Sequence, residues 1–232
     1  MLKSFLSLWL KFPCPLCQRT AENVLCSYCK SKLLSYKFKY PQQNWKEESP
    51  LFAWGRYDGE LSRAIAQLKY HNHPEVGTIL GQWLGESWLQ NCPVAARQKL
   101  IVLPIPLSSE KLQARGFNQA ELIAQGFCQA TNQTLNNQGL VRVKNTLAMF
   151  GLTPTQRDHN IKNAFEVSKT WQKKPPHYPV LLVDDIYTRG TTVKEATKTL
   201  RRFEVKVLGA IAVAKVSDRF KDNLNLRSTG NL

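Results

Sequence analysis

The sequence predicts an α/β protein in which helices flank a parallel β-sheet, with a small four-cysteine module in front of it. Strand-like and helix-like runs alternate from Leu51 onward, which is typical of parallel sheets with helical crossovers. Residues 180–183 are apolar at every position, as in a strand that is buried on both faces. Two Cys-x-x-Cys pairs precede these runs and predict a metal-organised module that is too small to have a core of its own.

The individual elements follow from local patterns. Leu61, Ile65 and Leu68 recur at helical spacing. Thr192 and Glu195 fit a capping box, which predicts that the last helix starts at Thr192. The expected helices are 61–70, 75–89, 118–130 and 192–202. The expected strands are 51–57, 99–105, 140–143, 164–167, 180–183 and 205–216.

The composition excludes a largely disordered chain, because 43% of the 232 residues are hydrophobic and 21% are charged. The 32 Lys and Arg residues exceed the 17 Asp and Glu residues, which leaves a net charge of +15. Such an excess fits polyanionic partners, either nucleic acid or phosphorylated small molecules, and does not choose between them.

The amino-terminal segment superficially resembles a signal peptide. Lys11 ends its apolar run, however, and no small-residue cleavage site follows. Its apolar residues recur at helical spacing, so we expect a short helix there. No run approaches the ~20 apolar residues of a membrane-spanning helix, so we expect a cytoplasmic protein without membrane insertion.

The predicted domain boundary lies where periodicity is lost. The segment before Leu51 is polar and contains Pro41 and Pro50, which is typical of a linker. We therefore expect a zinc ribbon with its amino-terminal helix, a linker, the main domain and a flexible tail. These parts are expected over 1–40, 41–50, 51–222 and 223–232.

Four of the six cysteines predict a structural zinc site. They form two knuckles separated by eight residues, so that four thiolates can surround one Zn²⁺ tetrahedrally. A disulfide pair is the poorer alternative in a reducing cytosol. The lysines that follow leave open whether the ribbon also contacts nucleic acid, although a solvated face is favoured. The predicted ligands are Cys14, Cys17, Cys26 and Cys29.

The segment after the buried strand predicts a phosphate site. Asp184 and Asp185 stand at the carboxyl end of that strand, and a short loop then opens a helix. A helix start offers free backbone N–H groups and a positive dipole end to an anion. Two carboxylates beside such a site suit a ligand that carries hydroxyls or a metal ion next to its phosphate, as a ribose 5-phosphate does. The loop residues are Thr188, Arg189, Gly190, Thr191 and Thr192.

This segment resembles the PRPP-binding motif of type I phosphoribosyltransferases. The resemblance implies that Asp184 and Asp185 bind the ribose hydroxyls and that residues 188–192 bind the 5-phosphate. Arg189 departs from the motif, because a second small Thr or Ser is common at that position. It would either add a charge-assisted phosphate contact or crowd the loop.

The chain as a whole resembles the ComF family of competence proteins, which join a four-cysteine zinc module to a phosphoribosyltransferase-like domain. The marks of this resemblance are the two knuckles, Tyr57-Asp-Gly, Leu68-Lys-Tyr70, Leu103-Pro-Ile-Pro-Leu107, Arg115-Gly-Phe-Asn-Gln-Ala120, Arg157 with Asn160, Ala164-Phe165 and the Asp184-Asp185 motif.

Basic residues on loops after strands suit a pyrophosphate, which is the other half of PRPP. The resemblance implies that Lys69, the Pro104 loop and the Arg115 to Asn118 segment line that part of the site, with Mg²⁺ bound to the ligand. Asn118 is also the expected N-cap of the helix over 118–130.

The expected function is therefore that of a PRPP-binding, phosphoribosyltransferase-like protein with a role in natural competence. If it catalyses, a nitrogen nucleophile would displace pyrophosphate at the ribose, and Asp184 and Asp185 would favour an oxocarbenium-like transition state. A non-catalytic module that senses PRPP and binds single-stranded DNA or a competence helicase is a second hypothesis. A nucleobase salvage enzyme is a third. The acceptor and the oligomeric state, including a homo-oligomer, stay open.

Overall fold

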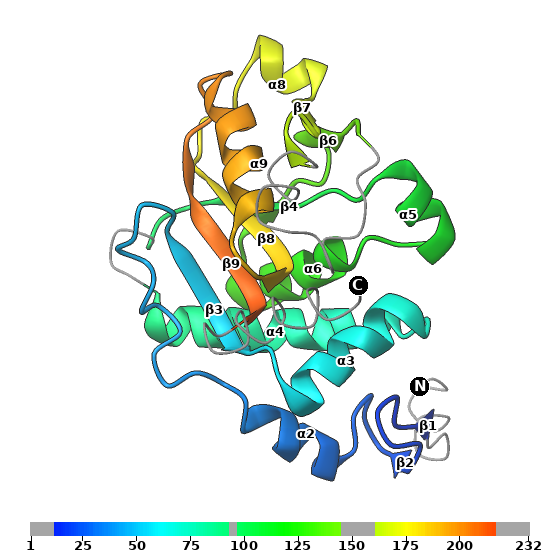
Figure 1. The fold of residues 1–232 in the computed structure, drawn as a ribbon. Coiled ribbons are helices and arrows are strands. Elements are labelled where there is room, and N and C mark those ends of the chain that lie inside the picture. Colours follow the sequence, from blue (N-terminus) through cyan, green and yellow to red (C-terminus); the bar gives the residue numbers. More distant parts are fainter. Residues whose placement is uncertain (1–11, 93–96, 145–160, 217–232) are drawn as a thin grey trace, which may run out of the picture.

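The computed structural model describes residues 12–92, 97–144 and 161–216. Its centre is a five-stranded sheet in which every neighbouring pair of strands is parallel (Figure 1). The strands in spatial order are β3 (Leu51–Arg56), β9 (Val207–Lys215), β8 (Val180–Tyr187), β4 (Ile101–Pro104) and β5 (Thr134–Leu135). The predicted fold class, a parallel sheet flanked by helices, is confirmed.

Helices cover both faces of this sheet. The helices α3 (Gly59–Tyr70), α4 (Pro74–Asn91) and α6 (Gln119–Thr131) share the core on one face, and α8 (Lys169–Lys173) and α9 (Thr191–Arg201) share the core on the other. A further helix, α5 (Ser109–Arg115), buries no residue. Consecutive strand residues point to opposite faces. Leu181 and Val183 of β8 therefore join the core beneath α4 and α6, whereas Val180 and Leu182 join the core beneath α9. Because β8 is buried on both faces, its polar residues are confined to its carboxyl end.

The helices α4 and α6 cross at small residues. A Cβ atom on Gly81 would lie 2.1 Å from the carbonyl oxygen of Ile123, and one on Gly126 would lie 2.1 Å from the carbonyl oxygen of Thr78. The two backbones are thus in direct contact.

Two predicted strands lie outside the parallel sheet. Residues 140–143 and 164–167 do form strands, β6 (Leu140–Arg142) and β7 (Phe165–Val167), but these pair with each other in an antiparallel, two-stranded sheet. Local patterns indicate that a segment is extended and do not indicate its partner. β7 packs beside α9, and its Phe165 and Val167 join the core on that face.

The start of α9 differs from the prediction. The helix begins at Thr191, and its N-cap is Gly190, whose φ of 74° lies in the left-handed region. The predicted capping box is therefore wrong. The Glu195 carboxylate instead accepts a hydrogen bond from the backbone N–H of Asn163, at 2.8 Å, because the chain before β7 lies closer to it than the helix start.

The helix α5 was expected to be a loop. None of its seven residues is buried, so the sequence carries no apolar periodicity that would have indicated a helix. In Figure 1 it stands out from the body of the molecule, on the side where β4 ends. It ends at Gly116 and leads directly into α6.

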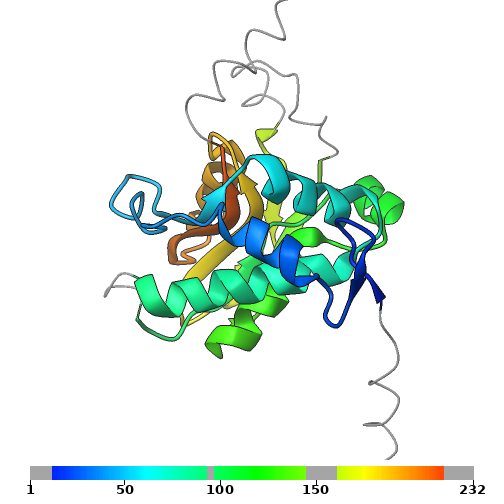
Figure 2. The same ribbon diagram turned by 90° about the horizontal axis from the view of Figure 1, so that it is seen from below.

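The amino-terminal module packs on the main domain. It contains β1 (Phe12–Pro13), β2 (Thr20–Ala21) and α2 (Ser27–Leu34). Its Leu16 and Leu33 are both at most 2% exposed and belong to the same core cluster as Leu61 of α3. Figure 2 shows α2 lying beside α3 and α4.

The segment expected as a linker also contacts the main domain. Trp45 is buried and meets Trp88 of α4 edge-on, with 5.3 Å between ring centroids. The expected amino-terminal helix and the tail over 223–232 lie outside the described residues. Within the described part of the chain, no helix is long and apolar enough to cross a membrane.

The crossing of α4 and α6 generates a test. Gly126→Ala should destabilise the protein, because a methyl group would meet the Thr78 carbonyl and neither backbone can yield. We expect about 1–3 kcal/mol of overpacking to exceed the ~1 kcal/mol that Ala gains over Gly in helix propensity. Urea unfolding measures the difference. Gln125→Ala on the same helix is the control, and a Gly126→Ala variant as stable as that control would contradict the close contact.

Candidate functional site

The candidate site lies at the carboxyl edge of the sheet, where Asp184 and Asp185 lie in the carboxyl-terminal half of β8. β8 lies between β4 and β9; β9 runs alongside Asp184, whereas the pairing with β4 ends one residue earlier, at Val183. The Lys69 side chain comes from the last turn of α3, and its Nζ forms an ion pair with the Asp185 carboxylate. The Lys69 side chain is 18% exposed and that of Asp185 only 5%. Two predicted site residues, far apart in the chain, are thus in direct contact.

The two neighbouring carboxyl groups differ electrostatically. Burial and the adjacent Asp185 carboxylate raise the pKa of Asp184 well above its ordinary value. Burial alone would also raise the pKa of Asp185, but the Lys69 ammonium lowers it below the ordinary value. The pKa of Lys69 is in turn raised, because Asp185 outweighs the effect of its burial. Asp185 and Lys69 therefore form the charged pair, and Asp184 is the carboxyl that takes up a proton first.

Other cations surround this pair. Burial lowers the pKa of Lys111, and the charges of Arg142, Arg115 and Lys69 lower it further. Burial also lowers the pKa of Arg142, while the Asp184 carboxylate acts in the opposite direction. Cations from α3, α5 and β6 are thus close enough to interact around two carboxylates. Such an arrangement suits a ligand that carries several negative charges.

Sequence reasoning missed Lys111 and Arg142. Lys111 lies on a helix without any buried residue, and Arg142 lies on a strand of the two-stranded sheet. Neither belongs to a recognisable motif, and both are placed near the carboxylates only by the fold. A search for basic residues just after predicted strands would have missed both, because Arg142 lies inside the predicted strand 140–143 and Lys111 lies several residues beyond the strand 99–105.

The Arg115 segment is held by its neighbours at the start of α6. Arg115 donates from Nη1 to the Gln119 side-chain oxygen, and its guanidinium lies 5.7 Å from the centroid of the Tyr70 ring. The predicted N-cap is confirmed, because the Asn118 side chain accepts from the N–H of Ala120 at 3.1 Å.

Asn118 also fixes the exit of β4. Its Nδ2 donates to the carbonyl of Ile105 at 3.0 Å, and Ile105 directly follows Pro104 at the end of that strand. The Pro104 loop and the Arg115 segment are therefore held together at the carboxyl edge. Arg157 and Asn160, which the family resemblance also marked, lie outside the described residues.

The loop between β8 and α9 is a tight turn. At Gly190, a Cβ atom would lie 2.1 Å from the Tyr187 hydroxyl, and the positive φ is itself unfavourable for other residues. The first α-helical backbone bond runs from the N–H of Lys194 to the Gly190 carbonyl, at 2.8 Å. The N–H groups of Thr191, Thr192 and Val193 therefore precede the helical ladder and are available to an anion.

The four predicted zinc ligands converge on one point. Their Sγ atoms all lie within 4.8 Å of one another, and those of Cys17 and Cys26 are 3.6 Å apart. Zn–S bonds of about 2.3 Å in a tetrahedron place sulfur atoms about 3.8 Å apart. Burial alone would raise the pKa of Cys14, but backbone hydrogen bonds lower it to about 7. Burial and the neighbouring thiols raise the pKa of Cys29, so the fit to a metal ion rests on the geometry of the four sulfur atoms. The set fits a metal ion of the size and ligand preference of Zn²⁺.

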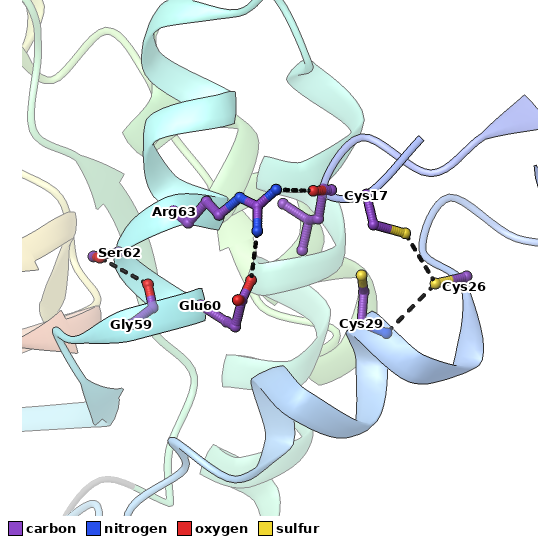
Figure 3. A network of polar contacts seen from close by, with 8 residues as sticks. Cys17, Cys26, Cys29, Gly59, Glu60, Ser62 and Arg63 are labelled. Carbon is purple, nitrogen blue, oxygen red and sulfur yellow. Dashed lines mark hydrogen bonds and ion pairs between the residues drawn. The ribbon is translucent and has the colours of Figure 1, made fainter. Parts of the chain in front are cut away.

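The cysteine module is anchored to the helix that carries Lys69. Arg63 of α3 donates from Nη2 to the carbonyl oxygen of Leu16, inside the first knuckle. Its Nη1 also lies 3.5 Å from the Glu60 carboxylate on the same helix. Figure 3 shows Arg63 directed from α3 toward the knuckle, with Cys17, Cys26 and Cys29 beside it. The helix α3 thus contacts the cysteine module through Arg63 and the carboxylate pair through Lys69.

The cysteine set generates a prediction about metal content. Purified protein should contain about one Zn²⁺ per chain, because four thiolates complete a tetrahedral site. Cys14→Ser should lower the zinc content and the thermal unfolding midpoint together, since the module has few contacts of its own without the ion. Elemental analysis and thermal melts measure both quantities. Cys128→Ser, outside the set, is the control; a metal-free parent protein with the same midpoint would contradict the site.

The carboxylate pair generates a prediction about stability. Asp184→Asn should raise the thermal midpoint at pH 7.5, because it removes a group whose ionisation is unfavourable in the fold. The native state holds this proton to a higher pH than the unfolded chain does, so stability falls as the pH rises above the ordinary carboxyl pKa. The gain in the variant should therefore shrink as the pH is lowered toward 4.

Asp185→Asn should act in the opposite direction. It leaves Lys69 buried without its partner, and loss of one member of a buried ion pair lowers the free energy of unfolding by about 3 kcal/mol. Thermal melts of both variants across pH 4.5–8 compare the two effects. Shifts of the same sign in both variants would contradict the assignment of Asp185 as the charged partner.

Comparison with known proteins identifies relatives along most of the chain. Competence protein F of Haemophilus influenzae is 28% identical over 214 residues, which cover 84% of this chain and 92% of that protein. DNA utilization protein YhgH of Salmonella typhi is 31% identical over 151 residues, 63% of each chain. Competence protein ComFC of Bacillus subtilis is 22% identical over 198 residues, which cover 81% of this chain and 70% of that protein.

Among solved structures, the glutamine PRPP amidotransferase of B. subtilis in complex with ADP and GMP is similar with a TM-score of 0.36 and 17% identity. The match covers 63% of this chain and 30% of that one, so this chain spans less than a third of the solved protein. No protein-family model matches the chain. The relatives named above nevertheless agree with the resemblance that the sequence motifs indicated: this protein is a homologue of proteins named competence protein F, competence protein ComFC and DNA utilization protein YhgH.

Proposed function

We propose that this protein binds PRPP together with Mg²⁺ at the carboxyl edge of its sheet, and that it serves the handling of transforming DNA. The observation that carries the proposal is the buried contact between Lys69 and Asp185. It brings a cation from another element onto a carboxylate pair that lies two residues before a turn of the phosphate-binding type. Carboxylates, a cation and a helix start are the three groups that a phosphorylated ribose with a second anionic end would need.

Each part of the ligand has a counterpart in the site. Asp184 and Asp185 would accept hydrogen bonds from the ribose hydroxyls. The N–H groups at the start of α9, with the hydroxyls of Thr188, Thr191 and Thr192, would hold the 5-phosphate. The half-buried Arg189 side chain lies in the same turn. In this assignment the acidic part of the site binds the ribose, and the part rich in N–H donors binds the phosphate.

The pyrophosphate would lie among the cations. Lys69 and Arg115, which the sequence indicated, and Lys111 and Arg142, which the structure adds, all interact electrostatically near the carboxylates. Mg²⁺ bound to the pyrophosphate would neutralise charge on the leaving group. The carboxylates would favour positive charge that develops on the ribose ring if a nitrogen nucleophile displaced the pyrophosphate.

The role in DNA handling is supported by the relatives. Two of them carry the name of competence proteins and one that of a DNA utilization protein. The net charge of +15 is compatible with a nucleic-acid partner. We place the protein in the cytoplasm, where four clustered thiols stay reduced and available for a metal ion.

Calorimetric titration with PRPP and Mg²⁺ tests the binding proposal. The parent protein should bind, and Asp184→Asn combined with Asp185→Asn should weaken binding at least tenfold, since the ribose hydroxyls would lose their charged acceptors. Glu166→Gln makes the same kind of change on the exposed face of β7 and should bind like the parent. Because the double variant also changes stability, Lys69→Met is a second variant that should weaken binding of the pyrophosphate end.

Separate titrations with ribose 5-phosphate and with pyrophosphate test which residues bind each half of PRPP. Lys69→Met should reduce the affinity for pyrophosphate more than that for ribose 5-phosphate, and the Asp variants should show the reverse order. A parent protein that binds none of these ligands would overturn the proposal. So would folded variants that bind PRPP as tightly as the parent does.

A further inference from the structure

A groove lies along the outer side of α9, away from the carboxylate pair. Its volume is about 520 Å³, and it lies between α9, the start of β9 and the segment that leads into β3. Its floor contains apolar side chains, among them Pro50, Val193 and Val207. Neither the cysteine module nor the carboxylate pair contributes to it, so the groove is a separate feature of the surface.

The rim of this groove is cationic. Four basic residues line it, against one acidic residue, Glu48. All four are exposed, and none forms an ion pair within the described part of the chain. By contrast, Arg56, Arg63 and Lys69 each have a carboxylate partner. The rim cations are Lys194, Lys198, Arg201 and Arg202.

The helix itself does not account for this pattern. Basic residues are favourable in the last turn of a helix because they interact with its dipole, and this explains Arg201 and Lys198. Lys194 lies in the first turn after the N-cap, where the dipole disfavours a cation. Lys194 and Lys198 are also four residues apart, a spacing at which like charges destabilise a helix. An anionic ligand would supply the missing compensation.

We infer that this α9 groove binds the phosphodiester backbone of a nucleic-acid strand. From Lys194 to Arg202 the helix rises about 12 Å at 1.5 Å per residue, which matches three to four nucleotides at about 3.4 Å per nucleotide. Cations distributed over two turns fit a row of phosphates better than a single compact phosphate group. The apolar floor offers a surface to the sugars, and sequence preference is not expected from backbone contacts.

The inference adds a second site to the proposed function and does not depend on the first. The groove begins at Val193, just after the turn that would hold the 5-phosphate, and runs along α9 toward the amino edge of the sheet. A strand bound there would leave the carboxylate pair accessible. PRPP binding and strand binding can therefore succeed or fail separately, and each has its own variants.

Fluorescence anisotropy with a labelled 20-residue oligothymidylate tests the inference. The combined variant Lys194→Gln, Lys198→Gln and Arg201→Gln should weaken binding at least tenfold at low salt. The slope of log affinity against log salt should fall by about 2, because each lost phosphate contact in a single strand contributes about 0.7. Titrations of this variant with PRPP and Mg²⁺ should match those of the parent.

The matched control removes three cations elsewhere. Lys169→Gln, Lys173→Gln and Lys174→Gln change the same net charge around α8, where all three side chains are exposed. This control should retain most of the affinity. Equal losses in the two triple variants would show that net charge alone attracts the strand, and would overturn the α9 groove as its site.

Three further outcomes would also overturn the inference. The first is a parent protein that does not bind the oligonucleotide. Lys30→Gln with Lys32→Gln in the cysteine module could abolish binding while the α9 variant retains it. Inorganic pyrophosphate at equal phosphate concentration could displace the strand completely, which would indicate a small-anion site. If the triple variant is unstable, Lys194→Glu alone should weaken binding, since it reverses a charge at an exposed position.

Discussion

The buried contact between the Lys69 ammonium and the Asp185 carboxylate determines the arrangement of the site. It joins the last turn of α3 to the carboxyl-terminal half of β8. Several other helices and strands lie between these two elements in the sequence. Buried ion pairs are costly to desolvate, and an apolar pair in the same place is often as stable. Asp184 beside it further lowers the stability of the fold, because burial and the neighbouring charge oppose its ionisation. This concentration of unfavourable charge at one strand end is best explained by a ligand that compensates it.

The helix α3 links this pair to the cysteine module. Arg63 reaches the Leu16 carbonyl within the first knuckle, and Lys69 lies six residues further along, about 9 Å at 1.5 Å per residue. Leu33 and Leu16 also pack with the apolar face of α3 in one core cluster. The module is therefore part of the support of the site, because the position of α3 depends on contacts at both of its ends.

Two groups of cations have different surroundings. Around the carboxylate pair the cations are partly buried and lie close to acidic groups, as for Arg142 near Asp184. Along α9 they are exposed, and no carboxylate in the described residues pairs with them. The first arrangement suits a small ligand in which one part binds to carboxylates and another part binds to cations. The second suits an extended polyanion.

The sequence by itself determined the features that depend on neighbouring residues. The apolar run over 180–183 predicted a strand buried on both faces, Asp184 and Asp185 follow it in the chain, and the spacing of the two knuckles predicted four converging thiolates. Asn118 was recognisable as an N-cap because capping is local. The tertiary structure alone decided the partners: β6 pairs with β7 outside the main sheet, Glu195 turns to Asn163 instead of its own helix, and Lys111 and Arg142 approach the carboxylates. Local patterns set backbone conformation and side-chain type, whereas contacts between distant segments arise only when the sheet brings them to the same edge.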